Sequence, residues 1–232
     1  MTTTSNQPDY VFYYGPGTCA LAGIITLEWI GRPYRLGRVT GEILWSDIYR
    51  KINPLTKVPA LSIDGRILLE NNAILTHLAD SAPDAKLSPL LGTPERDTLN
   101  QWISFLGTEF HPAFWPWFMP QRYTTDENDH PAIKAAAETM VASKFDYLND
   151  HLANNEYMLG TQRTILDHYL FAMARWGENF LDIPADYPHA ARHLEMMRAD
   201  ATVQFGLSVE AGKIVHAEDG GGSGFQGHVA LT

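Results

Sequence analysis

The pattern of apolar and polar positions changes character about a third of the way along the chain. In the first part, short apolar runs alternate with longer periodic segments, which indicates strands and helices in turn. Strands are expected at residues 10–14, 34–39, 60–63 and 67–69, and helices at residues 18–30, 44–52 and 72–81. Asp64-Gly65 lies between the last two strands and suits a type I′ hairpin turn. This order predicts a small mixed sheet with helices on its faces.

Strand signals end after a linker at residues 83–92 that is rich in Pro, Ser, Gly and Leu. Thr93-Pro94 then forms an N-cap and first-turn pair that predicts the start of a helix. Further helices are expected at residues 130–152, 164–176 and 188–199. Pro112 and Pro116 should kink the helix that begins at Pro94. Thr164 and Asp167 form a variant capping box, which we assign to folding alone.

These patterns divide the chain into two domains and a tail. An α/β domain is predicted over residues 9–83, and an all-α domain over residues 93–210. The last segment, residues 217–232, contains Gly220-Gly221-Gly222-Ser223-Gly224. This is the composition of flexible linkers, so a flexible glycine-rich tail is expected there.

Composition and charge exclude several classes of function. Of the 232 residues, 45% are apolar, which is enough for a full core. The formal net charge of −10 argues against a nucleic-acid or anionic-membrane partner. Residues 1–10 are polar and lack the apolar core of a secretion signal. The longest apolar stretch, residues 19–27, is far shorter than the ~20 residues that span a bilayer.

The chain has a single cysteine, Cys19, which follows the turn Gly15-Pro16-Gly17 at the start of the first predicted helix. A lone thiol cannot form an internal disulfide, exchange with a second thiol or supply a Cys-Cys metal pair. Together with the missing secretion signal, it predicts a reducing, cytoplasmic location. A helix start lowers the pKa of a cysteine and favours its thiolate, so Cys19 is a candidate reactive group. The alternative is a buried apolar thiol, which is common for free cysteine.

Five segments of the chain, in this order, resemble cytosolic glutathione transferases. They are residues 12–22, 53–61, 70–74, 108–111 and 160–170. The pairing of Cys19 with His111 resembles the bacterial beta class in particular. The resemblance spans roughly residues 10–205 and implies a thioredoxin-like N-terminal domain that binds glutathione, followed by an all-helical substrate domain.

The resemblance also implies which residues of the first domain bind glutathione, which would act as a co-substrate without a metal. Cys19 would lie beside the glutathione sulfur and either form a mixed disulfide with it or donate a hydrogen bond to its thiolate. Val58 precedes Pro59, which is expected to be cis, and would pair through its N–H and C=O with the cysteinyl backbone. Glu70 would take the γ-glutamyl ammonium, and Asn71 with its helix N-terminus would take the neighbouring carboxylate.

Other implied contributions come from the second domain. His111 would reach the sulfur region and donate to the thiolate or to a leaving group, because imidazole titrates near neutrality. Thr108 and Glu109 occupy positions that contact glutathione in the family. The aromatic run at residues 114–119 is expected to be core, a dimer seam or the wall of a pocket for an apolar co-substrate. Tyr14 is expected to pack on the core of the first domain.

Three positions depart from the family pattern. Asn71 stands where the family usually has Ser or Thr, and Ser104 stands where beta-class enzymes often have Asn. A lysine that contacts glutathione in the beta class has no clear counterpart, and Arg38 is the nearest basic residue.

The predicted function is conjugation of glutathione to an electrophilic, partly apolar small molecule, with detoxification as the implied role and a homodimer as the implied assembly. The first alternative is a glutathione-dependent redox enzyme or dehalogenase that acts through a mixed disulfide between Cys19 and glutathione. The second is a non-catalytic binding protein that uses the same fold.

Overall fold

The computed structural model describes residues 7–220 and 222–231 and divides them between two compact units. The first unit contains the chain up to Leu87 and from Ala199 onward, and the second runs from Ser88 to Arg198. Residues 1–6, on which the prediction about a secretion signal depends, lie outside the described residues. Across residues 7–220 and 222–231, every helix is too short or too polar to cross a membrane.

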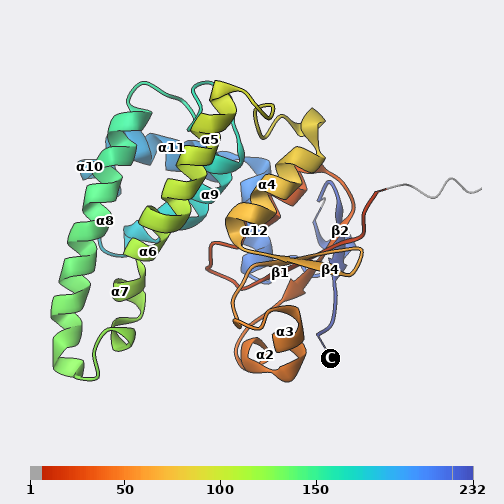
Figure 1. The fold of residues 1–232 in the computed structure, drawn as a ribbon, viewed down its shortest axis with the longest axis horizontal. Coiled ribbons are helices and arrows are strands. Elements are labelled where there is room, and N and C mark those ends of the chain that lie inside the picture. The colour runs from red at the N-terminus through yellow and green to blue at the C-terminus, as the bar shows by residue number, and fades with distance from the viewer. Residues whose placement is uncertain (1–6, 221, 232) are drawn as a thin grey trace, which may run out of the picture. The chain divides into compact units, whose positions relative to one another are not determined.

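Within the described residues, the first unit is built on a mixed sheet of five strands with the order β4-β3-β1-β2-β5 (Figure 1). The strands are β1 (Tyr10–Tyr14), β2 (Tyr34–Arg38), β3 (Ala60–Ile63), β4 (Arg66–Leu69) and β5 (Phe225–His228). β1 pairs in parallel with β2 and antiparallel with β3, as a βαβ unit followed by a hairpin requires. The predicted hairpin at Asp64-Gly65 is confirmed, and both residues have the positive φ of a type I′ turn.

The helices of the first unit are α1 (Leu21–Ile30), α2 (Glu42–Trp45), α3 (Asp47–Ile52), α4 (Asn71–Ser81) and α12 (Ala201–Glu210), with short 3-10 turns at Pro83–Ala85 and Ala217–Asp219. The single helix predicted over residues 44–52 is two helices. Ser46 separates them because its side chain accepts a hydrogen bond from the Tyr49 N–H and caps α3. α12 packs closely on α1, where Gly206 lies against Leu21.

The C-terminal segment differs from the flexible tail that composition predicts. β5 extends the sheet by pairing in parallel with β2, with Phe225 opposite Tyr34 (Figure 1). The Phe225 ring is buried in the core of the first unit. The backbone at Gly224 passes so close to the backbone at Arg32 that a Cβ on Gly224 would lie 2.1 Å from the Arg32 carbonyl oxygen. Gly224 therefore serves close packing, and α12 and the C-terminal strap (residues 222–231) belong to the first unit.

The second unit is helical, as predicted. Its helices are α5 (Pro94–Phe105), α6 (His111–Ala113), α7 (Trp115–Phe118), α8 (His130–Leu152), α9 (Ile165–Ala174), α10 (Ile183–Asp186) and α11 (Pro188–Ala199), with a π-helical turn at Leu106–Phe110 and 3-10 turns at Pro120–Arg122, Glu127–Asp129 and Gly177–Asn179. Thr93 caps α5 by accepting from the Arg96 N–H. The segment that contains Pro112 and Pro116 forms two short helices instead of continuing α5, because proline removes backbone donors.

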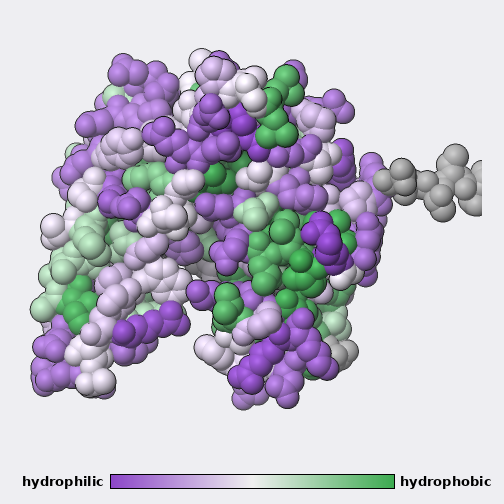
Figure 2. All heavy atoms as spheres, in the orientation of Figure 1, coloured by the Kyte–Doolittle hydropathy of each residue, from purple (hydrophilic) through white to green (hydrophobic). Residues whose placement is uncertain are grey.

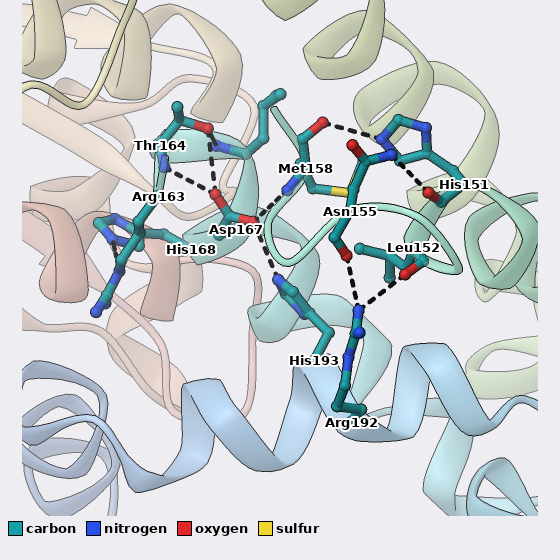
Figure 3. A network of polar contacts seen from close by, with 11 residues as sticks. His151, Leu152, Asn155, Met158, Arg163, Thr164, Asp167, His168, Arg192 and His193 are labelled. Atoms are coloured by element: carbon teal, nitrogen blue, oxygen red, sulfur yellow. Dashed lines mark hydrogen bonds and ion pairs between the residues drawn. The ribbon is translucent and has the colours of Figure 1, made fainter. Parts of the chain in front are cut away.

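A buried polar network fixes the start of α9 (Figure 3). Thr164 and Asp167 form the predicted capping box, with the Thr164 N–H donating to Asp167 Oδ2 at 2.7 Å. The other oxygen of the fully buried Asp167 accepts from the Met158 N–H at 2.8 Å and lies 3.0 Å from His193 Nε2. A buried carboxylate is stable only when hydrogen bonds replace its water. The contacts of Asp167 therefore assign it to folding.

Candidate functional site

Strand register brings three of the predicted segments to one end of the sheet in the first unit. Tyr13 in β1 lies opposite Ala60 in β3, and Ala60 lies opposite Leu69 in β4. The residues that follow β1, precede β3 and follow β4 therefore share one edge. These are the cysteine turn (residues 15–19), Val58-Pro59 and Glu70-Asn71.

The cysteine turn is held by its own threonine. The Thr18 hydroxyl donates to the Gly15 carbonyl at 2.7 Å and accepts from the Ala20 N–H at 3.2 Å. Gly17 has a φ of 75°, a conformation that glycine adopts without steric cost. A Cβ at Gly15 would lie 3.2 Å from Val58 Cγ2, so the turn packs directly on the second segment.

Cys19 lies inside this edge, and its predicted low pKa is wrong. The residue is only 5% exposed, and burial raises the pKa of its thiol to about 12, with the Glu70 carboxylate acting in the same direction. α1 begins at Leu21 with Ala20 as its N-cap. Desolvation outweighs the helix dipole because the thiolate would be removed from water. The thiol is therefore protonated near neutral pH.

The second segment offers an unpaired stretch of backbone. Val58-Pro59 is cis, as expected from the resemblance. The Lys57 carbonyl before it is fixed at 2.7 Å by both the Tyr49 hydroxyl and the Asn53 amide. Among the described residues, the N–H and C=O of Val58 have no hydrogen-bond partner. This leaves a donor and an acceptor beside the cysteine turn.

The third segment contains a strained residue and an unsatisfied one. Glu70 precedes α4 with a φ of 70°, which costs a non-glycine residue roughly 1–3 kcal/mol. Asn71 is buried, and its Nδ2 donates to the Cys19 carbonyl at 3.4 Å. Its Oδ1 is buried without a hydrogen-bond partner among the described residues. Such groups are rare in folded proteins, so this oxygen is a candidate ligand contact.

Sequence reasoning missed a further residue at the cysteine turn. Glu210, the last residue of α12, is buried, and its Oε1 accepts from the Gly17 N–H at 2.9 Å. Arg38, the basic residue nearest to the missing lysine, reaches 3.5 Å from the carbonyl of Glu210. Tyr14 is fully buried, as expected, and its hydroxyl lies 3.0 Å from His228 Nε2. Nothing in the sequence near residue 17 indicates a partner 193 positions away.

In the second unit, His111 begins α6 and lies in an aromatic cluster. Its ring stacks on Trp115 with centroids 5.8 Å apart and lies 5.3 Å from the ring of Trp176. The Tyr169 hydroxyl lies 3.5 Å from His111 Nδ1. The ring of the exposed Phe118 packs against the Trp176 ring, with centroids 5.8 Å apart. The cluster therefore combines a titratable ring with polarizable apolar surface.

Thr108 and Glu109 lie in the π-helical turn that precedes His111, and both are exposed. The Thr108 hydroxyl donates to the Ser104 carbonyl at 2.9 Å. The Glu109 carboxylate pairs with Lys144 of α8 at 2.7 Å. Both side chains thus have partners within the second unit.

Comparisons with known proteins agree with this geometry. Residues 22–86 match the family model for the glutathione S-transferase N-terminal domain, and residues 108–200 match that for the C-terminal domain. A glutathione S-transferase of Escherichia coli is 34% identical, covering 85% of this chain and 97% of that protein.

Two solved structures are also similar. A sphingomonad glutathione S-transferase complexed with glutathione is 32% identical over 87% of this chain and 98% of its own, with a TM-score of 0.78. A bacterial beta class enzyme of Sphingomonas chungbukensis is 35% identical over 86% and 98%, with a TM-score of 0.77. This chain belongs to the glutathione S-transferase family.

Proposed function

We propose that the protein is a glutathione transferase that conjugates glutathione to electrophilic, partly apolar small molecules. The observation that carries the proposal is the convergence of Cys19, the unpaired Val58 backbone and Glu70-Asn71 at one edge of the sheet in the first unit. A tripeptide thiol presents a backbone, a zwitterionic end and a sulfur. Each of the three segments suits one of these parts.

The backbone and the zwitterion of glutathione have matching groups. The N–H and C=O of Val58 would pair with the cysteinyl backbone as an added strand. The Glu70 carboxylate would accept from the γ-glutamyl ammonium, and the unpartnered Asn71 Oδ1 offers that ammonium a second acceptor. The N-terminus of the 11-residue α4 would bind the neighbouring carboxylate. Asn71 thus supports the ammonium where the family's usual Ser or Thr hydroxyl would donate.

The sulfur chemistry follows from the protonated state of Cys19. Its S–H would donate a hydrogen bond to the glutathione thiolate and stabilise it. The glutathione thiol releases its proton to solvent, and its sulfur attacks the electrophilic carbon. A carbon–sulfur bond forms while the leaving group departs with its electron pair. A mixed disulfide between Cys19 and glutathione would need a Cys19 thiolate and an oxidant, and the burial of Cys19 disfavours the former.

In the second unit, we propose that the cluster of Trp115, Trp176 and Phe118 binds the apolar part of the electrophile. Aromatic rings offer large apolar area with few rotatable bonds. His111 is proposed as the second catalytic residue, because the Tyr169 hydroxyl at Nδ1 orients its ring. Thr108 and Glu109 are proposed to contact glutathione, as the resemblance implies.

A cytoplasmic homodimer is proposed for the assembly. The single cysteine is free, which suits a reducing compartment. Figure 2 shows apolar residues gathered over β1 and β4 of the first unit, where Ile67, Leu68 and Leu69 are only half-buried. On α8, Met140 and Tyr147 are exposed. Sedimentation equilibrium that returns the mass of one chain would refute the dimer.

Replacing Glu70 tests the function. Glu70→Gln should raise the KM for glutathione about 10- to 100-fold in conjugation of an activated aryl chloride, because it removes a charge-assisted hydrogen bond of about 1.5–3 kcal/mol. Glu127→Gln on an exposed 3-10 turn of the second unit is the matched control and should leave KM unchanged. An unchanged KM in Glu70→Gln, or wild-type protein without any conjugation, would sink the proposal.

The role of Cys19 can be separated from the function itself. Cys19→Ala should slow conjugation and raise the apparent pKa of bound glutathione, because a hydrogen bond to the thiolate is lost. Intact-protein mass after incubation with oxidised glutathione should show no added glutathionyl group. A glutathionyl adduct on Cys19, with disulfide-reductase activity that Cys19→Ala abolishes, would favour the redox alternative.

A further inference from the structure

The end of α12 reaches the cysteine turn from the other end of the chain. Glu210 Oε1 accepts from the Gly17 N–H at 2.9 Å, and the residue is 8% exposed. Gly17 lies two residues before Cys19 and has a φ of 75°. A buried, charge-assisted hydrogen bond to a main-chain N–H constrains backbone position more strongly than an exposed contact.

The placement of Glu210 is unfavourable for α12 itself. A carboxylate in the last turn of a helix lies at the negative end of the helix dipole, and this position is unfavourable for the helix. Burial of a charge adds a further cost unless hydrogen bonds compensate for lost water. The Gly17 N–H provides such a bond, and the Arg38 guanidinium lies near the same helix end, 3.5 Å from the Glu210 carbonyl.

α12 is anchored independently of this bond. Val209, the preceding residue, is fully buried in the core of the first unit. Gly206 brings the helix against α1, where a Cβ would lie 2.8 Å from Leu21 Cδ1. Glu210 therefore extends from a packed helix to the cysteine turn, which Thr18 and the Asn71 side chain also hold.

We propose that Glu210 is a positioning residue that holds the cysteine turn in the conformation that buries Cys19 and presents the turn to glutathione. Only the presentation of the turn to glutathione rests on the proposed function. The burial of Cys19 can be measured without any substrate, because the chain has one cysteine and alkylation reports on it alone.

Three variants separate reach from charge. Glu210→Gln keeps the length of the side chain and an acceptor oxygen, whereas Glu210→Asp keeps the charge but is shorter by one methylene. Glu210→Leu keeps the volume and removes the acceptor. If position is what matters, alkylation of Cys19 by iodoacetamide should accelerate about tenfold in the Asp and Leu variants, the factor that ~1.4 kcal/mol represents. The Gln variant should stay near the wild-type rate.

Val209→Ala is the matched control, because it loosens the packing of α12 and keeps the Glu210 carboxylate that accepts from the Gly17 N–H. It should lower the melting temperature while leaving alkylation of Cys19 near the wild-type rate. Accelerated alkylation in Val209→Ala equal to that in Glu210→Leu would reduce Glu210 to general packing and overturn the proposal. Wild-type alkylation rates in both the Asp and Leu variants would overturn it as well.

Kinetics supply the second readout. The Asp and Leu variants should raise KM for glutathione more than they lower kcat, and the Gln variant should rescue KM. A decrease confined to kcat would assign Glu210 to the chemical step and overturn the positioning role. If glutathione fails to slow alkylation of the wild-type thiol, the proposed function is at fault, while the comparison among the Glu210 variants stands by itself.

Discussion

Two glycine-rich segments of the first unit use glycine for different physical reasons. At Gly17 the backbone has a φ of 75°, and nothing lies within 4 Å of the position that a Cβ would take. At Gly224 a Cβ would lie 2.1 Å from the Arg32 carbonyl oxygen. The first glycine supplies a conformation and the second supplies proximity. The two segments have similar composition. Only the atoms around each glycine show that Gly17 lies in an open turn and that Gly224 lies where two backbone segments pack closely.

Removing the C-terminal strap gives the largest expected effect. A chain that ends at His216 loses the buried Phe225 ring and the β5 pairing, and leaves Glu28 without the hydrogen bonds of Ser223. The free energy of unfolding should fall by at least about 3 kcal/mol, since loss of a buried Phe ring alone costs ~3–5 kcal/mol. Urea unfolding followed by Trp fluorescence measures this change.

Phe225→Ala is the companion variant, because it keeps the strap backbone and removes only the ring. It should account for most of the loss that truncation causes. An unchanged urea midpoint in the truncated chain would mean that the strap behaves as the flexible tail that its composition predicts.

Most of the first unit could be predicted because its signals are local. The hairpin at Asp64-Gly65 follows from two residues whose turn chemistry is specific. The two-domain order, and Cys19 at the start of a helix, follow from hydrophobic periodicity and from the family resemblance. The unpaired backbone beside Pro59 required the family as well, because an isolated X-Pro bond says little about its surroundings.

Apart from the division of residues 44–52 between two helices, the errors concern interactions between residues far apart in the chain. A helix start predicts a lowered pKa for Cys19, whereas burial of the thiol raises it. Asn71, 52 positions away, contacts the Cys19 carbonyl. β5 is only four residues long and pairs with β2 just over 190 positions earlier in the chain. Glu210 likewise meets Gly17 across 193 positions. Both lie beyond residue 200, where the match to the family's C-terminal domain ends.

Substitutions at the two glycines test the comparison directly. Gly224→Ala should destabilise the protein by about 1–3 kcal/mol, because the added methyl group overlaps the Arg32 carbonyl. Gly17→Ala should cost about 1–2 kcal/mol through its backbone conformation alone. Urea unfolding of each single variant measures these changes in the free energy of unfolding.

Asparagine then separates the two causes. Gly17→Asn should be milder than Gly17→Ala, because Asn tolerates positive φ. Gly224→Asn should be no milder than Gly224→Ala, because a larger side chain meets the same carbonyl. The reverse ranking at either position would contradict the distinction between conformation and proximity.

Acid should loosen the strap but not the cysteine turn, and this is the smallest effect. Burial lowers the pKa of His228, and the charges of Arg38 and His216 lower it further, although a hydrogen bond to the Val215 carbonyl opposes them. The detached strap therefore takes up a proton before the docked strap does. The contribution of neutral His228 is complete above the unfolded pKa of about 6.5 and is lost as the pH falls through the lower folded value.

Amide exchange at pH 7.5 and 5.5, corrected for intrinsic rates, measures this loosening. The Val229 N–H donates to the Leu36 carbonyl at 2.7 Å and reports on the strap, whereas the Gly17 N–H reports on the cysteine turn. Protection of Val229 should fall at pH 5.5 while that of Gly17 stays constant. His228→Gln should remove the pH dependence of protection at Val229, because the side-chain amide of glutamine does not titrate in this range. If Val229 loses as much protection in His228→Gln as in the wild type, the acid sensitivity comes from another group and the docked strap does not depend on a neutral His228.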